Sequence, residues 1–136
     1  MSVDICFIRD KAGKAFMGRG EVLVAYLYGS VAKGKAHKGS DIDIGVVLAE
    51  DYKPDPFYES RLSAELSKAF GAEAEVRVLN GQSIVFLHQV LKYGVLLFSR
   101  DEKTRVGFET YTYSRYLDFR PFFEAYNKER RKRVLA

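Results

Sequence analysis

The chain has 136 residues, of which 47% are apolar and 29% charged, and its net charge is +4. This length predicts one domain over residues 1–136 with a single hydrophobic core, and leaves no room for a separate substrate domain. The apolar runs are far shorter than the roughly 20 residues of a membrane span, and the first residues predict neither a signal peptide nor a lipid anchor. The single cysteine, Cys6, excludes an intrachain disulfide, favours a reducing cytoplasm and is expected to be buried or half-buried.

Hydrophobic patterning in the first half of the chain predicts two buried strands joined by a glycine-serine turn. Residues 22–28 form a continuous apolar run rich in β-formers, which is typical of a buried central strand. Turn residues and alternation predict the remaining elements: a short helix over 10–15, a turn over 18–20, a short helix over 30–35, a polar loop over 36–40 and a second strand over 41–48. We expect the second strand to lie beside the first.

The next part of the chain predicts alternating helices and strands. Asp55 and Pro56 favour a helix N-terminus, with Asp55 as the N-cap, and Gly71 favours its end. The apolar positions of this helix fall on one stripe: Phe57, Leu62, Leu66, Ala69 and Phe70. The later elements are a strand over 73–79, a helix over 82–92 ended by Gly94, and a strand over 95–99.

Residues 101–133 predict a long helical segment that Pro121 kinks or splits in two. Its buried side is expected to be mostly aromatic: Phe108, Tyr111, Tyr116, Phe119, Phe123 and Tyr126. One small core cannot absorb so many rings, so part of this surface favours a protein–protein interface. The order of elements predicts an α/β (α+β) fold in which helices flank a small mixed β-sheet.

The most informative residues are the carboxylates of the second strand. Alternation along a strand places Asp41 and Asp43 on the same face, with Cα atoms about 6.5 Å apart. Two such carboxylates repel each other unless a cation lies between them, and Mg²⁺ binds to a few carboxylates together with substrate phosphates. The sequence therefore predicts a site for divalent cations, with two Mg²⁺ ions expected.

Two-metal phosphoryl transfer usually needs a third acidic group. The third predicted strand offers Glu73 and Glu75, which alternation places on one face. Glu75 is preferred because it lies inside the strand rather than at its start. The alternative for Glu75 is a surface charge that pairs with Arg77 or a lysine.

The residues before the aspartates suit a phosphate group. Gly29 can adopt backbone angles that other residues cannot, and it allows close approach of a phosphate. The Ser30 hydroxyl and the nearby backbone N–H groups face the expected phosphate position. Lys33 can supply a counter-charge, and Gly34 permits a second tight bend.

Basic side chains gather in two places, beside this motif (Lys33, Lys35, His37, Lys38) and at the C-terminus (Lys128, Arg130, Arg131, Lys132, Arg133). A basic rim around a phosphate site is expected on electrostatic grounds. The C-terminal group has two readings, a solvated helix end or a contact with an acidic partner or RNA. His88 lies among apolar residues and is expected to pack within a helix rather than bind a ligand.

Gly29-Ser30, followed by Asp41-Ile42-Asp43, resembles the signature of the polymerase-β-type nucleotidyltransferase superfamily. The small size and several later segments resemble a subfamily, the minimal nucleotidyltransferases or MntA-like partners of HEPN-domain proteins. These segments are residues 75–80, 90–97 and 116–119, so the resemblance covers about residues 22–120. It implies a type VII-like antitoxin that binds a HEPN ribonuclease toxin, and an enzyme that transfers AMP from ATP to a toxin tyrosine.

The resemblance also implies roles for individual residues. Gly29 and Ser30 would bind the triphosphate, together with Lys33, Gly34 and Ser40. Asp41 and Asp43 would hold Mg²⁺, and Glu75 stands at the position of the third carboxylate, where the family usually has Asp. The implied partners are ATP and the toxin, in a hetero-oligomer or alongside a homodimer, with no membrane and no direct nucleic-acid binding.

Two alternatives remain open from the sequence. The protein could neutralise its toxin by binding alone, without catalysis. It could also modify a small molecule, as aminoglycoside-type nucleotidyltransferases do, although a chain of this length has no second domain to build an acceptor pocket.

Overall fold

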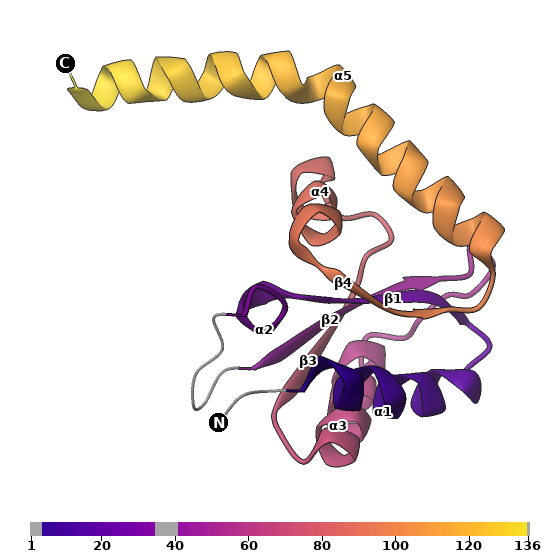
Figure 1. The fold of residues 1–136 in the computed structure, drawn as a ribbon. Coiled ribbons are helices and arrows are strands. Elements are labelled where there is room, and N and C mark those ends of the chain that lie inside the picture. Colours follow the sequence, from indigo (N-terminus) through magenta and orange to yellow (C-terminus); the bar gives the residue numbers. More distant parts are fainter. Residues whose placement is uncertain (1–3, 35–40, 136) are drawn as a thin grey trace.

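A computed structural model describes residues 4–34 and 41–135 (Figure 1). Nine elements follow one another along these residues: α1 (Ile5–Met17), β1 (Val22–Tyr28), α2 (Gly29–Ala32), β2 (Ile42–Leu48), α3 (Tyr58–Phe70), β3 (Ala74–Val78), α4 (Ile84–Tyr93), β4 (Val95–Ser99) and α5 (Glu102–Leu135). The predicted fold class, a small mixed sheet flanked by helices with a long C-terminal helix, is confirmed. None of the helices in this part of the chain combines the length and apolar character that a membrane span requires.

The four strands form one sheet in the order β3-β2-β1-β4. β1 lies antiparallel to β2 and to β4, whereas β2 and β3 run parallel. The run at 22–28 is therefore a central strand, as its continuous apolar character predicts. The strand that carries the aspartates lies beside it, so the expected neighbour relation is also confirmed.

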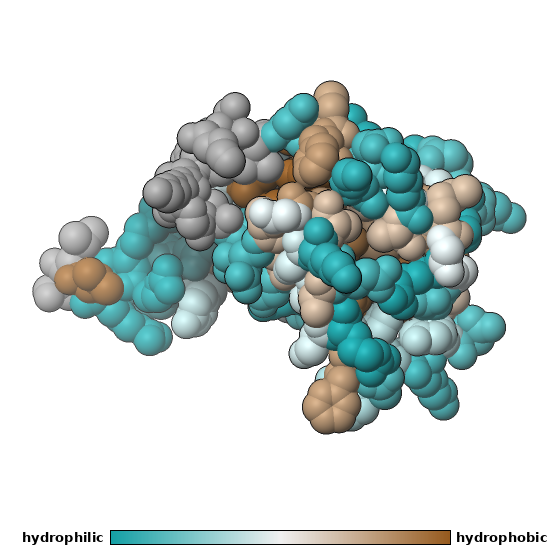
Figure 2. Space-filling view, turned by 90° about the horizontal axis from the view of Figure 1, so that it is seen from below, coloured by the Kyte–Doolittle hydropathy of each residue, from teal (hydrophilic) through white to brown (hydrophobic). Residues whose placement is uncertain are grey.

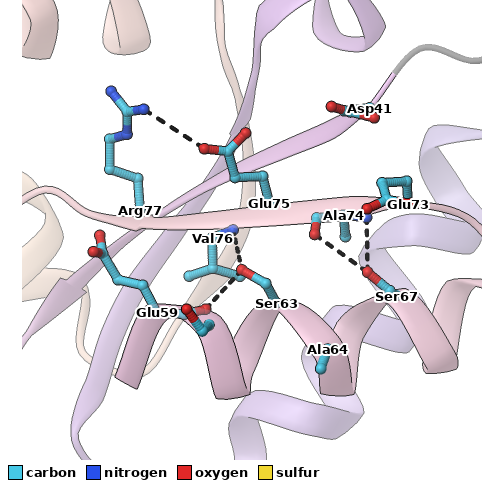
Figure 3. Close-up of a pocket in the computed structure, with 11 residues that line it drawn as sticks. Asp41, Glu59, Ser63, Ala64, Ser67, Glu73, Ala74, Glu75, Val76 and Arg77 are labelled. Atoms are coloured by element: carbon cyan, nitrogen blue, oxygen red, sulfur yellow. Dashed lines mark hydrogen bonds and ion pairs between the residues drawn. The ribbon is translucent and has the colours of Figure 1, made fainter. Parts of the chain in front are cut away.

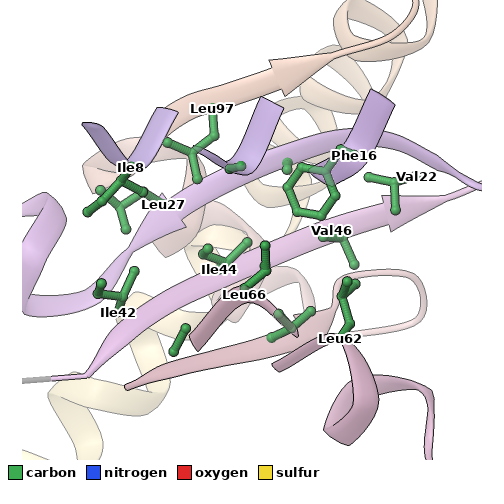
Figure 4. Close-up of a cluster of buried hydrophobic side chains, with 14 of the residues drawn as sticks. Ile8, Phe16, Val22, Leu27, Ile42, Ile44, Val46, Leu62, Leu66 and Leu97 are labelled. Carbon is green, nitrogen blue, oxygen red and sulfur yellow. The ribbon is translucent and has the colours of Figure 1, made fainter. Parts of the chain in front are cut away.

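Helices α1 and α3 cover one face of the sheet, and α4 and α5 lie over the other (Figure 1). The first face is closed by apolar residues spaced four apart on each helix: Ile8, Ala12 and Phe16 on α1, and Leu62, Leu66 and Phe70 on α3. These side chains pack against Ile42, Ile44 and Val46 of β2 (Figure 4). The second face holds a smaller cluster formed by Val24, Tyr26, Val47, Leu79, Leu87 and Val90.

Side chains of α3 also cap the outer edge of β3, which has no strand beyond it within the sheet. Ser67 accepts the N–H of Ala74 at 2.8 Å, and Ser63 accepts the N–H of Val76 at 2.8 Å. Glu59 accepts the N–H of Val78 at 2.8 Å. A spacing of four on the helix matches a spacing of two on the strand, because both advance about 6 Å. The edge is thereby satisfied within the chain and closed to pairing with another strand.

The N-terminal helix is longer than the sequence predicted. The expectation of a short helix over 10–15 is wrong, because α1 covers the 13 residues Ile5–Met17. Its N-cap is Asp4, whose side chain accepts the N–H of Cys6 at 2.9 Å. Only three residues of α1 are buried, so its apolar stripe is too sparse to read from the sequence. Cys6 lies off that stripe and is exposed, against expectation.

The start of α3 also differs from the prediction. Asp55 is not the N-cap; the helix begins at Tyr58 after Phe57. Asp55 instead accepts the N–H of Phe57 at 2.8 Å and pairs with both terminal nitrogens of Arg61. Phe57 is 69% exposed, and Tyr58 occupies the buried place that was expected for Phe57. Gly71 ends the helix at a φ of 67°, as predicted.

The last helix, α5, is continuous over 34 residues with Pro121 inside it. It changes direction near its middle rather than splitting (Figure 1). The expected aromatic burial holds in part: Phe108, Tyr116 and Phe123 are half-buried, whereas the rest of the predicted set is exposed, namely Tyr111, Phe119 and Tyr126. The helix extends beyond the end of the core, so its second half has no core to bury these rings.

Candidate active site

Three strands bring one polar residue each to the same end of the sheet. Tyr28 of β1 is the register partner of Asp43 of β2, and Asp43 is the register partner of Glu75 of β3. Neighbouring strands lie about 4.8 Å apart, so these residues form a row across the sheet. The row lies on the α4 and α5 face. Residues separated by an even number along a strand point to the same face, and Val47 and Leu79, each four residues after Asp43 and Glu75, pack on that face.

The centre of this row is a half-buried carboxylate. Burial raises the pKa of Asp43 above its usual value, the negative charges of Glu75 and Asp41 raise it further, and Arg77 opposes the shift. Asp41 lies two residues earlier, just before β2, and is exposed. Carboxylates held together against their own repulsion are the donor set that a hard divalent cation relieves. Asp41 and Asp43 therefore have the carboxylate chemistry that suits such a cation.

Gly29 stands directly beside Asp43. It has a positive φ of 77°, and a Cβ built on it would collide with the Asp43 carboxylate. Only glycine therefore allows the chain to turn from β1 into α2 while the carboxylate occupies this place. Ser30 follows as the second residue of α2. The structure thus brings together the glycine-serine turn and the second aspartate, as the sequence predicted.

Glu75 has a partner in the structure. Its Oε1 lies 3.6 Å from Nη2 of Arg77, and both side chains are about half exposed. The Arg77 guanidinium also lies over the ring of Phe86 in α4, 5.5 Å from its centroid. Figure 3 shows Glu75 and Arg77 on one side of β3, with Asp41 nearby, and the serines of α3 on the other. Among the described residues, no three acidic, histidine or cysteine side chains are placed to hold a metal ion together.

A groove of about 580 Å³ runs along β3 and α3 (Figure 3). Asp41, Glu73, Glu75 and Arg77 line it, together with Ser63 and Ser67. Gly29 and Asp43 do not line this groove, so it borders the carboxylate row rather than containing it. Glu73, the other candidate for the third acid, lies one residue before β3 and is exposed.

The remaining phosphate-site candidates are less closely grouped. The Lys33 ammonium lies over the ring of Tyr93, 4.8 Å from its centroid, and so points toward the end of α4. Gly34 has a φ of 71°, which agrees with the predicted tight bend. Ser40 and three basic residues of the same loop, Lys35, His37 and Lys38, lie outside the described residues.

Sequence reasoning missed Tyr28 as a site residue. Its ring packs edge-on against Phe86, with centroids 5.6 Å apart, and burial raises its pKa to about 12, so the hydroxyl stays protonated at neutral pH. Its position directly before Gly29 was a signal, but the apolar run gave no reason to separate Tyr28 from the core. The pairing of Tyr28 with Asp43 depends on strand register, which the sequence did not reveal.

His88 packs within α4, as predicted. Its ring stacks on Tyr116 of α5 with centroids 3.5 Å apart and an angle of 2° between the planes. Burial lowers the pKa of His88, and Lys92 and Arg120 lower it further. The residue thus joins α4 to α5 and lies apart from the carboxylate row.

Several known proteins resemble this chain in sequence or in structure. The chain is 31% identical over 77 residues to the protein adenylyltransferase MntA of Shewanella oneidensis, an alignment that covers 57% of this chain and 54% of that relative. It therefore spans about half the length of this relative. A crystal structure of a toxin-antitoxin with AMP-PNP matches with a TM-score of 0.74 and 25% identity, over 94% of this chain and 98% of that chain.

A structure of a tri-AMPylated Shewanella oneidensis HEPN toxin in complex with MNT antitoxin matches with a TM-score of 0.72. The identity is 22%, over 98% of this chain and 100% of that one, so this likeness supports the fold. The family model described as "Polymerase beta, Nucleotidyltransferase" matches residues 10–103, which include the glycine-serine turn, both aspartates and Glu75. This chain belongs to the polymerase beta nucleotidyltransferase family.

Proposed function

We propose that this protein is a Mg²⁺-dependent adenylyltransferase that acts as an antitoxin by transferring AMP from ATP to a tyrosine of a HEPN toxin. The observation that carries the proposal is the half-buried Asp43, which lies against Gly29 and between Tyr28 and Glu75, with Asp41 two residues away. Family membership supports nucleotidyl transfer. A relative named protein adenylyltransferase and a fold neighbour with an AMPylated toxin support the acceptor.

Each residue has a role in this mechanism. Asp41 and Asp43 would hold the cation, and Glu75 would join them. Gly29 lets the triphosphate approach the backbone, and Ser30 offers its hydroxyl to the phosphates. When bound, Mg²⁺ neutralises the triphosphate and polarises the α-phosphate.

The reaction needs little covalent chemistry from the protein. The acceptor tyrosine oxygen attacks the α-phosphorus, the bond between that phosphorus and the bridging oxygen breaks, and pyrophosphate leaves. The carboxylate of Glu75 is the proposed acceptor of the tyrosine proton. Positioning and charge neutralisation supply most of the rate enhancement, so changes to the aspartates should stop transfer without unfolding the chain.

The test uses a HEPN-domain protein, the proposed acceptor, and ATP labelled in the α-phosphate. Asp41→Asn/Asp43→Asn should reduce label transfer at least a hundredfold. The control Asp10→Asn/Asp51→Asn changes two exposed aspartates outside the site and should keep wild-type transfer. Full labelling by the Asp41→Asn/Asp43→Asn variant would refute the proposed catalysis.

Neutralisation by binding alone is the second candidate. The Glu75–Arg77 ion pair favours it, because a guanidinium already neutralises the third carboxylate. Calorimetry separates the two functions, since a binding-only antitoxin should show no Mg²⁺-dependent affinity for ATP. It should also protect cells from the toxin equally well with both aspartates replaced by asparagine.

A further inference from the structure

The C-terminal part of α5 extends away from the body of the protein (Figure 1). We call residues 117–134 the arm; as a helix it is about 27 Å long. Every side chain from Glu124 to Val134 is exposed. A helix of this length gains most of its stability from packing rather than from intrinsic propensity, so a bare arm indicates a surface that is covered by something else.

The arm has two chemically different segments. The first carries Phe119, Phe122, Phe123 and Tyr126, a spacing of three and four that places the rings along one side of the helix. Phe122 is 70% exposed and Tyr126 is 65% exposed. The second segment, residues 128–133, holds five basic side chains and one acid. Its net charge of +4 equals that of the whole chain, so the rest of the protein is balanced.

The arm and the carboxylate row lie on the same side of the sheet. α5 covers the face on which Asp43 and Glu75 lie, and the arm points toward the end of the molecule where α2 is found (Figure 1). The opposite face, formed by α1 and α3, shows mainly hydrophilic side chains with scattered hydrophobic ones (Figure 2). A protein held by the arm would therefore be held beside the carboxylates.

We propose that the arm is the docking surface for the protein that carries the acceptor tyrosine, and that this partner offers an apolar strip next to a group of acidic side chains. This inference rests on the proposed function. Aromatic side chains dominate binding when a partner encloses them, and charge complementarity speeds association and fixes register. The arm provides exposed aromatic rings in its first segment and positive charge in its second.

The arrangement of charge disfavours RNA as the occupant. Surfaces for single-stranded RNA mix basic groups with stacking rings. Here the ring-bearing segment, residues 117–127, has two acids and one arginine, and the basic segment, residues 128–133, contains no aromatic residue. The two chemistries are thus separated along the helix.

A second copy of the chain fits no better. In an antiparallel pair centred on the rings, each basic segment would lie against residues 112–117 of the other copy, which include Arg115 and no acid. In a parallel pair the two basic segments would lie side by side and repel each other.

The experiment measures affinity for the HEPN-domain protein that serves as acceptor in the transfer assay, by surface plasmon resonance with the full chain. Phe122→Ala/Tyr126→Ala should weaken binding at least 30-fold. The matched control is Phe57→Ala, because Phe57 is equally exposed on another part of the molecule. Arg130→Glu/Arg133→Glu should slow association about tenfold at low salt, with a smaller effect at high salt. Its control is Lys53→Glu/Lys68→Glu, two exposed lysines outside the arm.

Mg²⁺-ATP affinity, measured by calorimetry on the same variants, should stay within threefold of wild type. Loss of partner binding in both arm variants, with unchanged controls, supports the inference. A wild-type complex that binds but transfers no AMP would count only against the proposed catalysis. Unchanged partner binding in both arm variants overturns it. It is also overturned if the arm variants lose affinity for a labelled RNA oligomer, or dissociate a dimer of this chain, while partner binding stays as in wild type.

Discussion

The two faces of the sheet are built for different purposes. On the α1 and α3 face, β2 presents Ile42, Ile44 and Val46, which are at most 2% exposed. On the α4 and α5 face the same strand presents Asp43, which is only half-buried and destabilised by neighbouring carboxylates. One strand thus contributes to the core with one set of side chains and to the candidate site with the other.

This difference shows where the molecule can tolerate strain. Crowded carboxylates and a glycine with positive φ cost free energy, and they persist only where the surrounding structure holds them. The closed apolar face supplies that support. Substitutions on the α1 and α3 face should therefore lower stability, whereas substitutions at the carboxylate row should mainly affect ligand binding and catalysis.

Leu62→Ala should have the largest effect on stability. Leu62 is fully buried on the closed face, and its removal leaves a cavity, which costs about 2–5 kcal/mol of unfolding free energy. Urea unfolding measures this loss. The control Leu117→Ala makes the same change on the exposed arm and should stay within about 0.5 kcal/mol of wild type. Equal losses in the two variants would contradict the division between the faces.

Gly29→Ala should damage the site more than the fold. A left-handed backbone costs a non-glycine residue about 1–2 kcal/mol, and the new Cβ would also displace the Asp43 carboxylate. We expect Mg²⁺-ATP affinity, measured by calorimetry, to fall about tenfold or more, since each tenfold is 1.4 kcal/mol. Gly81→Ala is the matched control, because Gly81 has a φ of 81° with open space around it. It should lose stability to a similar degree while ATP affinity is unchanged.

Ser63→Ala tests the capped edge of β3. The hydroxyl accepts the N–H of Val76 and donates to the carbonyl of Glu59 at 2.6 Å. Removing it leaves a part-buried N–H without its acceptor, which costs about 1–2 kcal/mol. Ser60→Ala, on the exposed side of the same helix, should be near neutral. Thermal unfolding distinguishes the two, and an equally neutral Ser63→Ala would show that the edge gains nothing from α3.

Asp43→Asn should have the smallest effect of these four changes, and it should stabilise the ligand-free protein. Because the folded-state pKa of Asp43 is raised, the ionised carboxylate costs stability above that pKa, and the cost disappears as the pH falls below the unfolded-state value. At neutral pH we expect a Tm rise of roughly 2–5 °C, which shrinks on acidification. Scanning calorimetry across pH measures it. A lower Tm at neutral pH would contradict the inference that the ionised Asp43 carboxylate destabilises the folded protein.

Much of the fold followed from the sequence. Continuous apolar character predicted β1, and glycine signals predicted the ends of α3 and α4. The prediction failed where few side chains carry the signal, as in α1, and where a polar side chain does another task, as Asp55 does by pairing with Arg61. It also failed for the exposed rings of α5, because periodicity shows which residues share a side but not whether anything covers that side.

By itself, the sequence determined that Asp41 and Asp43 share a face and that a glycine-serine turn precedes them, because strand alternation and backbone permissiveness are local properties. Strand register, which depends on contacts distant in sequence, placed Tyr28 and Glu75 on either side of Asp43 and Gly29 against its carboxylate. The same packing set Arg77 against Glu75 and left the arm of α5 without a core to cover it. Only the tertiary structure could decide these features, because they arise where separate elements meet or fail to meet.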